Sequence, residues 1–149
     1  MARIELHPDF KDFLRLLTFF EVKYLLVGGY AVGYHGYPRS TGDMDIWIER
    51  SETNAKKITS AFQAFGVPRD IVYEDLFLEM KKVIRMGVPP VRLEVITDAS
   101  GVDFKECFSN REVAEIEGIQ VNLISLPDLK KNKQAAGRHK DLEDILHLP

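Results

Sequence analysis

The sequence predicts an α/β (α+β) fold in which a mixed β-sheet is flanked by helices. Two observations lead to this class. Segments with apolar residues at helical spacing are interleaved along the chain with short runs that are uniformly apolar or alternate with a period of two, as strands do. In addition, several neighbouring strand candidates are joined by connections too short for a crossover helix, so some strands must pair antiparallel. A purely parallel, doubly wound sheet is therefore excluded.

Five elements are expected in the first half of the chain. Pro8 suits the first turn of an amphipathic helix, and Gly28 breaks a short apolar strand into a tight turn. A second strand alternates apolar and polar residues, and Ser51 caps the helix that follows, which Gly66 ends. The predicted helices cover residues 7–22, 31–36 and 51–66, and the predicted strands cover residues 24–27 and 43–49.

The second half is expected to begin with a less regular stretch and to continue with two adjacent strands, a short helix, a hairpin and a C-terminal helical segment. The hairpin turn is marked by Glu117-Gly118. Pro127 begins the last helical segment, which Gly137 divides. The predicted strands cover residues 82–86, 91–97, 112–116 and 119–124, and the predicted helices cover residues 103–108 and the two parts on either side of Gly137, the second over 138–148.

Length and composition narrow the class of protein. The chain has 149 residues, 45% hydrophobic and 29% charged, with a formal net charge of -3, which predicts a single domain over residues 1–149 with its own core. The single Cys107 cannot form a disulfide within the chain, and the first residues lack the apolar segment of a signal peptide. No apolar run approaches the roughly 18 residues of a membrane span. We expect a cytoplasmic protein with no membrane partner. The acidic balance argues against a general nucleic-acid binder.

The glycine turn after the first strand is the first candidate for chemistry. A strand, a two-glycine turn (Gly28-Gly29) and the start of a helix can present bare backbone N–H groups to a phosphate, which a Cβ would hold away. Two well-known phosphate motifs fail here. A dinucleotide fingerprint needs glycine where Tyr30 stands, and a Walker loop needs lysine where Tyr34 stands.

Three acidic residues are the second candidate. Asp43 and Asp45 lie two residues apart on one strand, so their carboxylates share a face, where like charges repel unless a cation lies between them. Glu94 lies inside a strand whose Leu93 and Val95 face the core, so it points to the opposite face. If the two strands are neighbours, all three acids meet. Such a set holds one or two divalent ions, with Mg²⁺ favoured and Mn²⁺ acceptable.

Simpler roles for these residues remain open. The two aspartates could mark a solvated strand end, and Glu94 could be a surface residue paired with Arg92 or another neighbour. Arg39 could contact a triphosphate or the acids, or form an ion pair that orders the loop before the second strand. Thr41 could cap or stiffen the same loop.

The C-terminal basic residues and the tryptophan can each be interpreted as structural or as ligand-binding. The cations of residues 130–140 suit an exposed helix, but Lys133 or Arg138 could instead bind phosphates of a nucleotide or of an RNA acceptor, with Asp141 holding the cation in position. Trp47, on the face of the acids, packs structurally or stacks on a base.

These motifs together resemble a known family. The order of Gly28-Gly29, a short helix, Arg39-Ser40-Thr41, Asp43-x-Asp45 and an isolated strand acid is similar to that of the DNA polymerase β-like nucleotidyltransferase superfamily. Within it, the chain most resembles small stand-alone prokaryotic nucleotidyltransferase-like proteins related to minimal nucleotidyltransferases and to AbiEii-type toxins. Residues 126–145 also resemble the helix that closes many of these domains. The resemblance spans residues 22–148.

The resemblance implies a nucleotidyltransferase-like fold and the transfer of a nucleoside monophosphate from an NTP to a hydroxyl, with Mg²⁺ and release of pyrophosphate. It implies that Gly28 and Gly29 cradle the triphosphate, that Asp43 and Asp45 bind both metal ions, and that Glu94 is the third ligand and base. The expected nucleotide contacts add three residues of the same motifs: Arg39, Thr41 and Lys133. Many active members carry serine where Gly29 stands here.

The implied partners are a hydroxyl acceptor on tRNA or on a protein, and a cognate antitoxin if the chain belongs to a toxin–antitoxin pair. Two other functions remain open. One is a catalytically silent binding module of the same fold that acts through a protein partner. The other is a metal-dependent phosphohydrolase that uses the same acids.

Overall fold

The computed structural model describes residues 5–149; residues 1–4, part of the stretch expected to lack a signal peptide, lie outside this range. Helices are interleaved with single strands and with pairs of consecutive strands along the chain, as the sequence predicts. In chain order the elements are α1 (Pro8–Phe19), β1 (Tyr24–Val27), α2 (Gly28–Tyr34), β2 (Asp43–Ile48), α3 (Glu52–Phe65), the 3-10 helix η1 (Glu74–Leu78), β3 (Val83–Val88), β4 (Val91–Ile96), α4 (Phe104–Ser109), β5 (Glu112–Ile116), β6 (Ile119–Leu123), α5 (Leu126–Ala136) and α6 (His139–His147).

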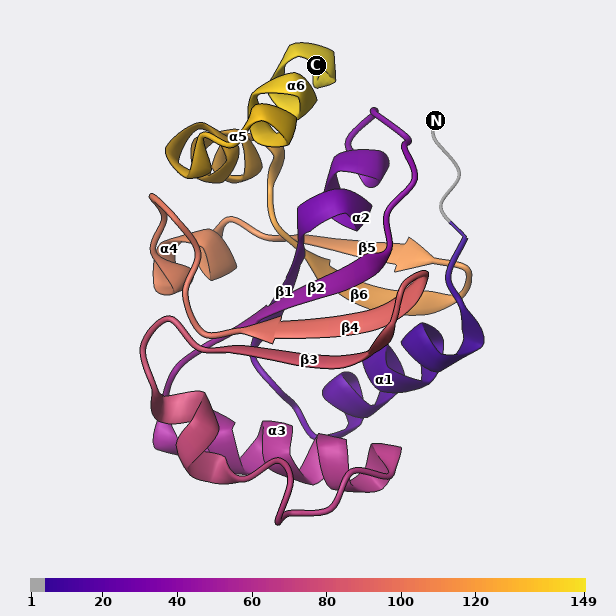
Figure 1. Ribbon diagram of the computed structural model, residues 1–149, viewed down its shortest axis with the longest axis vertical. Helices are drawn as coiled ribbons and strands as arrows, with labels where there is room; N and C mark the ends of the chain where they lie inside the picture. Colours follow the sequence, from indigo (N-terminus) through magenta and orange to yellow (C-terminus); the bar gives the residue numbers. More distant parts are fainter. Residues whose placement is uncertain (1–4) are drawn as a thin grey trace.

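The strands form one mixed sheet in the order β3-β4-β2-β1-β6-β5 (Figure 1). The pairs β2/β4 and β1/β6 are parallel, whereas β1/β2, β3/β4 and β5/β6 are antiparallel. The predicted mixed sheet is therefore confirmed. Its consequence for the site is that β2 and β4, which carry the three acids, are direct neighbours.

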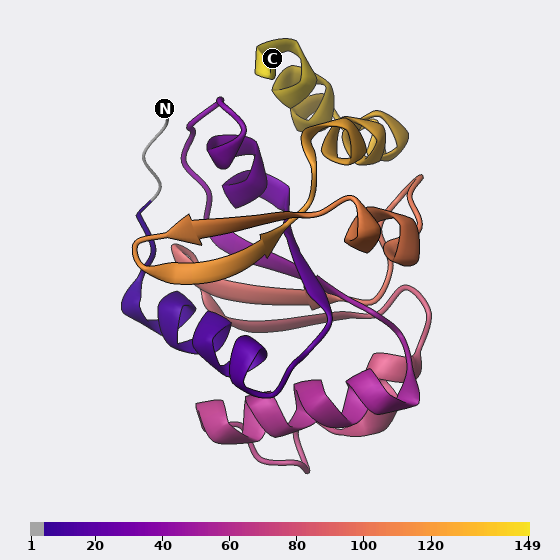
Figure 2. The same ribbon diagram turned by 180° about the vertical axis from the view of Figure 1, so that it is seen from behind.

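Helices lie on both sides of this sheet (Figures 1 and 2). The two views show α1 and α3 together on one side and α2, α5 and α6 on the other. The first side holds the main core, where Phe13 of α1 and Phe62 of α3 have ring centroids 5.0 Å apart. Met44, Ile46 and Ile48 of β2 are fully buried, as the period-two pattern predicts. The alternate residues of β2 therefore face the other side, toward the C-terminal helices.

Several boundaries differ from the sequence-based predictions. Helix α1 ends at Phe19 rather than at residue 22, because Glu21 adopts a φ of 56° and the amide of Val22 returns to Leu17 O at 2.9 Å. Helix α2 begins at Gly28 itself rather than at residue 31. The stretch expected to be irregular contains η1, whose Phe77 is fully buried. In the part of the chain that the structure describes, no helix has the length and apolar character needed to cross a membrane.

Candidate functional site

Strands β2 and β4 bring the three predicted acids together. In the parallel register Asp45 lies opposite Glu94. Asp43 lies two residues before Asp45 on β2, on the same face of the sheet. One carboxylate oxygen from each of Asp43, Asp45 and Glu94 lies within 4.8 Å of the others. We call these three residues the acid triad. Its three hard oxygen donors are of the kind that Mg²⁺ or Mn²⁺ binds.

The glycine turn lies beside the acid triad, because Val27 of β1 pairs with Asp45 of β2. Gly28 has a φ of 68°, and a Cβ added there would collide with the Asp45 carboxylate. A Cβ on Gly29 would lie 2.7 Å from Thr41 Oγ1. The two glycines are therefore required to make room for the protein's own side chains. Sequence reasoning assigned them only to a phosphate.

Crowding of carboxylates changes the electrostatics of the site. Burial is the main cause that raises the pKa of Asp45 to about 8, and the neighbouring Glu94 and Asp43 contribute to this rise. The charged form of Asp45 is thus disfavoured while no cation is present. A divalent ion between the carboxylates would reverse this penalty, which is the expected behaviour of a metal site.

Two arginines of the neighbouring strands pair with the acid triad. Arg92 of β4 grips Asp43 through two hydrogen bonds, Nε to Oδ1 at 2.6 Å and Nη2 to Oδ2 at 3.0 Å. This contact holds the pKa of Asp43 below its usual value. Arg85 of β3 donates from Nε to Glu94 Oε1 at 2.7 Å. Of the partners considered for Glu94, Arg92 is wrong, because the antiparallel β3/β4 register sets Arg85 directly opposite Glu94.

A second charged group, which we call the buried ion cluster, links α5 and α6 to the loop before β2. Its residues are Arg39, Lys133, Asp141 and Asp144. Lys133 Nζ lies 3.1 Å from Asp141 Oδ1 and 3.0 Å from Asp144 Oδ2, and its side chain is only 5% exposed. Arg39 donates two hydrogen bonds to Asp144, at 2.7 and 2.8 Å. Of the two roles considered for Arg39, the structure shows the ion pair that orders the loop.

The remaining predicted residues also have defined local partners. Thr41 Oγ1 donates to the backbone oxygen of Asp43 at 3.1 Å and so stiffens the start of β2. Lys133 forms the pair with Asp141 that the sequence suggests, and it is buried rather than exposed on its helix. Trp47 is 2% exposed and packs edge-on against Phe104, with ring centroids 5.1 Å apart, so it is not free to stack on a base.

The acid triad, the two glycines and part of the buried ion cluster line one cleft of about 460 Å³. The lining also includes Lys133 and Arg138 of the C-terminal helices, Arg85 of β3 and the chain that follows β4. The predicted site residues that line it are Gly28, Gly29, Arg39, Thr41, Asp43, Asp45, Glu94 and Lys133.

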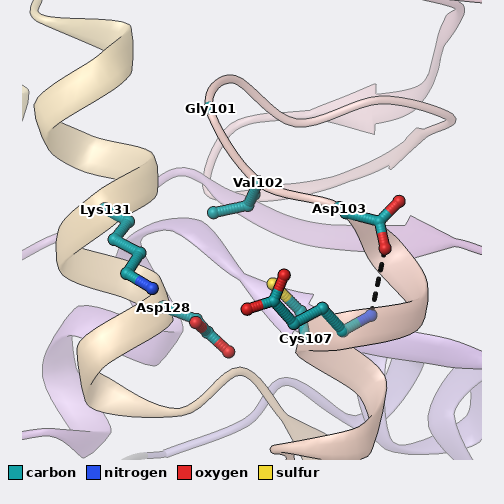
Figure 3. Close-up of a pocket in the computed structure, with 7 residues that line it drawn as sticks. Gly101, Val102, Asp103, Cys107, Asp128 and Lys131 are labelled. Atoms are coloured by element: carbon teal, nitrogen blue, oxygen red, sulfur yellow. Dashed lines mark hydrogen bonds between the residues drawn. The ribbon is translucent and has the colours of Figure 1, made fainter.

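A second hollow, of about 430 Å³, lies between α4 and α5 (Figure 3). Cys107 is buried at its base, and burial together with the nearby Asp128 raises the pKa of its thiol to about 12. A thiol in that state is inert at neutral pH. Asp103 caps α4 by accepting a hydrogen bond from Glu106 N at 3.1 Å. The cleft at the acid triad is therefore the stronger candidate for a functional site.

Comparison with known proteins agrees with this fold. A crystal structure from Thermotoga maritima, of a protein proposed to be a nucleotidyltransferase, superimposes with a TM-score of 0.64. The match covers 95% of this chain and 93% of that one, at 15% sequence identity. At the level of sequence, neither a protein-family model nor a curated protein matches. The chain therefore has the nucleotidyltransferase fold, and its activity must be argued from its own side chains.

Proposed function

We propose that the protein is a metal-dependent nucleotidyltransferase that moves a nucleoside monophosphate from an NTP to a hydroxyl of a macromolecular acceptor, either tRNA or a protein. The observation that carries this proposal is the convergence of Asp43, Asp45 and Glu94 within 4.8 Å on one face of a sheet with the nucleotidyltransferase fold. The acidic set lies in a cleft large enough for a nucleotide.

The acid triad fits a divalent ion. Its donors are carboxylate oxygens, and the raised pKa of Asp45, caused first by burial and then by Glu94 and Asp43, supports the proposal because a divalent ion would stabilise the charged form. Asp43 and Asp45 would hold the metal ions, with Glu94 as the third ligand. When bound, Mg²⁺ or Mn²⁺ would neutralise the triphosphate charge and lower the pKa of the acceptor hydroxyl.

Residues of the chain itself accept the proton and bind the triphosphate. In the proposed reaction the acceptor oxygen forms a bond to the α-phosphorus, the bond to the leaving pyrophosphate breaks, and the hydroxyl proton passes to Glu94. Gly28 and Gly29 offer backbone N–H groups without a Cβ to hold the triphosphate away. Lys133 uses two of its three N–H donors on Asp141 and Asp144, which leaves one for a phosphate oxygen.

The proposal is tested by incubating the purified protein with each α-labelled NTP, Mg²⁺ and a cell lysate. We expect label to appear on one acceptor. Asp45→Asn should reduce the labelling rate by at least about 100-fold, since even outer groups of metal sites contribute 10- to 100-fold. Asp75→Asn is the matched control, because Asp75 is an exposed aspartate of η1. Equal labelling by wild type and Asp45→Asn would contradict the proposal.

One observation favours a second candidate, a catalytically silent module that acts through a protein partner. Both Asp43 and Glu94 are already ion-paired with arginines, and Gly29 lacks the hydroxyl that serine would supply. Calorimetric titration with ATP and Mg²⁺ separates the two candidates. Binding of ATP together with labelling of an acceptor supports the enzyme. The absence of both supports the silent module.

A further inference from the structure

A row of paired residues crosses four strands at the centre of the site. Val27 of β1 lies opposite Asp45 of β2, Asp45 lies opposite Glu94 of β4, and Glu94 lies opposite Arg85 of β3. Neighbouring strands are about 4.8 Å apart, so Arg85 is about 10 Å from Asp45 across the sheet. The glycine turn follows Val27 directly. The acid triad therefore lies between the glycine turn on one side and Arg85 on the other.

The cationic side chains that line the cleft differ in their ion-pair partners. Lys133 and Arg138 pair with the buried carboxylates of α6, which are outside the acid triad. Arg85 is held only through one Nε contact to Glu94, among the contacts found for residues 5–149, and its side chain is 59% exposed. A guanidinium has five N–H donors in a fork that matches a phosphate. Arg85 thus has most of its donors free at the open edge of the sheet.

We propose that Arg85 binds a phosphate of the acceptor, and that the acceptor is accordingly the 3′ end of an RNA rather than a protein side chain. This inference rests on the proposed function. In an in-line transfer the attacking hydroxyl enters opposite the leaving pyrophosphate. With the triphosphate at the glycine turn, the acceptor enters from the side of Glu94 and Arg85. An RNA 3′ end carries a phosphate one ribose away from its hydroxyl, whereas a serine, threonine or tyrosine hydroxyl has no adjoining anion.

Arg85 can leave Glu94 for a phosphate because a single contact holds it there. A Glu94 carboxylate engaged with a divalent ion is a weaker acceptor for the guanidinium. Arg85 then exchanges one anionic partner for another, so no uncompensated charge is created. Arg92 does not share this property, because it grips Asp43 through two hydrogen bonds and its side chain is less exposed.

The test is fluorescence anisotropy of a labelled eight-nucleotide single-stranded RNA in the presence of Mn²⁺, with Arg85→Gln compared against wild type. One lost phosphate contact should lower the slope of log affinity against log salt by about 0.7 and weaken binding about fourfold at 0.15 M salt. Arg69→Gln is the matched control: Arg69 is also an exposed arginine paired with a glutamate, Glu74, but it lies outside the cleft. It should behave as wild type.

Measuring Mn²⁺ binding apart from RNA binding separates the role of Arg85 from the proposed metal site. Binding of Mn²⁺ alone, followed by electron paramagnetic resonance, should be at least as tight in Arg85→Gln as in wild type, because Glu94 has lost a competing cation. If Mn²⁺ binds wild type but the RNA affinity and salt slope are equal in Arg85→Gln, the role of Arg85 is overturned while the metal site stands. If wild type binds no Mn²⁺, both are overturned. Labelling of a protein acceptor at the same rate by wild type and Arg85→Gln also overturns the inference.

Discussion

Two groups of acidic side chains lie at or beside one cleft, and the pKa of Asp45 in the first group shifts in the opposite direction from those of Asp141 and Asp144 in the second. In the acid triad, burial and neighbouring carboxylates raise the pKa of Asp45 to about 8. In the buried ion cluster, burial alone would raise the pKa of Asp141, but the hydrogen bonds from Arg138 and Lys133 outweigh it and lower the pKa. Asp144 shows the same balance, with Arg39 and Lys133 as its partners.

This difference separates a functional cluster from a structural one. The carboxylates of α6 have cations of the protein itself close at hand, so their charges stabilise the fold. The acid triad has two arginines at its rim, and the pKa of its half-buried Asp45 is nevertheless raised. Perturbed groups of that kind concentrate at functional sites. The contrast predicts opposite responses to substitution, pH and divalent ions.

The largest effect is expected from Asp144→Ala. Lys133 then keeps a single carboxylate and Arg39 loses its bidentate partner, so buried charge is left uncompensated. The free energy of unfolding should fall by about 3–5 kcal/mol, measured by urea denaturation. Asp12→Ala, which removes an exposed pair with Arg15, should cost less than about 1 kcal/mol. A loss below 1 kcal/mol for Asp144→Ala would mean that the cluster does not stabilise the fold.

The next effect concerns pH and Mn²⁺ in the wild-type protein. Because the pKa of Asp45 is raised to about 8 on folding from an unfolded value of about 3.9, the folded state holds the extra proton between these values. The contribution of Asp45 to the free energy of unfolding therefore falls as the pH rises from about 4 through 8. The lowered pKa values of Asp141 and Asp144 act oppositely, since their stabilisation is lost as the pH falls below about 4.

Mn²⁺ should offset the penalty at high pH, because it binds the charged form of Asp45. At 100 times its dissociation constant it should stabilise the fold by about 2.7 kcal/mol. Thermal unfolding at pH 6 and pH 8, with and without Mn²⁺, measures this, and the shift in Tm should be larger at pH 8. An equal shift at both pH values would show that Asp45 is not a ligand.

The smallest predicted effect is an increase in the stability of the fold. Asp45→Asn should stabilise the metal-free protein at pH 8 by about 0.5–2 kcal/mol, since it removes a charge that the folded state disfavours. The same variant should lose the Mn²⁺-dependent rise in Tm. Thermal unfolding against wild type measures both. A destabilised Asp45→Asn protein would indicate that Asp45 stabilises the fold as Asp144 does.

Much of the acid triad could be predicted from the sequence because strand periodicity is local. Alternation within residues 43–49 and 91–97 predicts that Asp43, Asp45 and Glu94 point away from the core, but that the two strands are neighbours is known only from the sheet order. Their partners were not predictable in this way, since Arg85 meets Glu94 through the register of two strands. The geometric reason for Gly28 was equally hidden, because it depends on the close approach of β1 to Asp45.

The buried ion cluster shows the same limit more strongly. Lys133 lies in the most basic segment of the chain, which indicates an exposed helix, yet two acids of α6 allow its burial. Arg39 was correctly placed in the loop before β2, but its partner Asp144 follows 105 residues later. No local pattern connects such a pair.

That separation also orders events during synthesis of the chain. A ribosome adds about 5–20 residues per second, so Asp144 is made roughly 5–20 s after Arg39. Until then the loop that leads into β2 lacks the partner that fixes it, although both strands of the acid triad have already been made. The nascent chain therefore passes through a period in which the acids exist but the wall of their cleft does not. The wall of the cleft is completed only after α6, which carries Asp144, has been made.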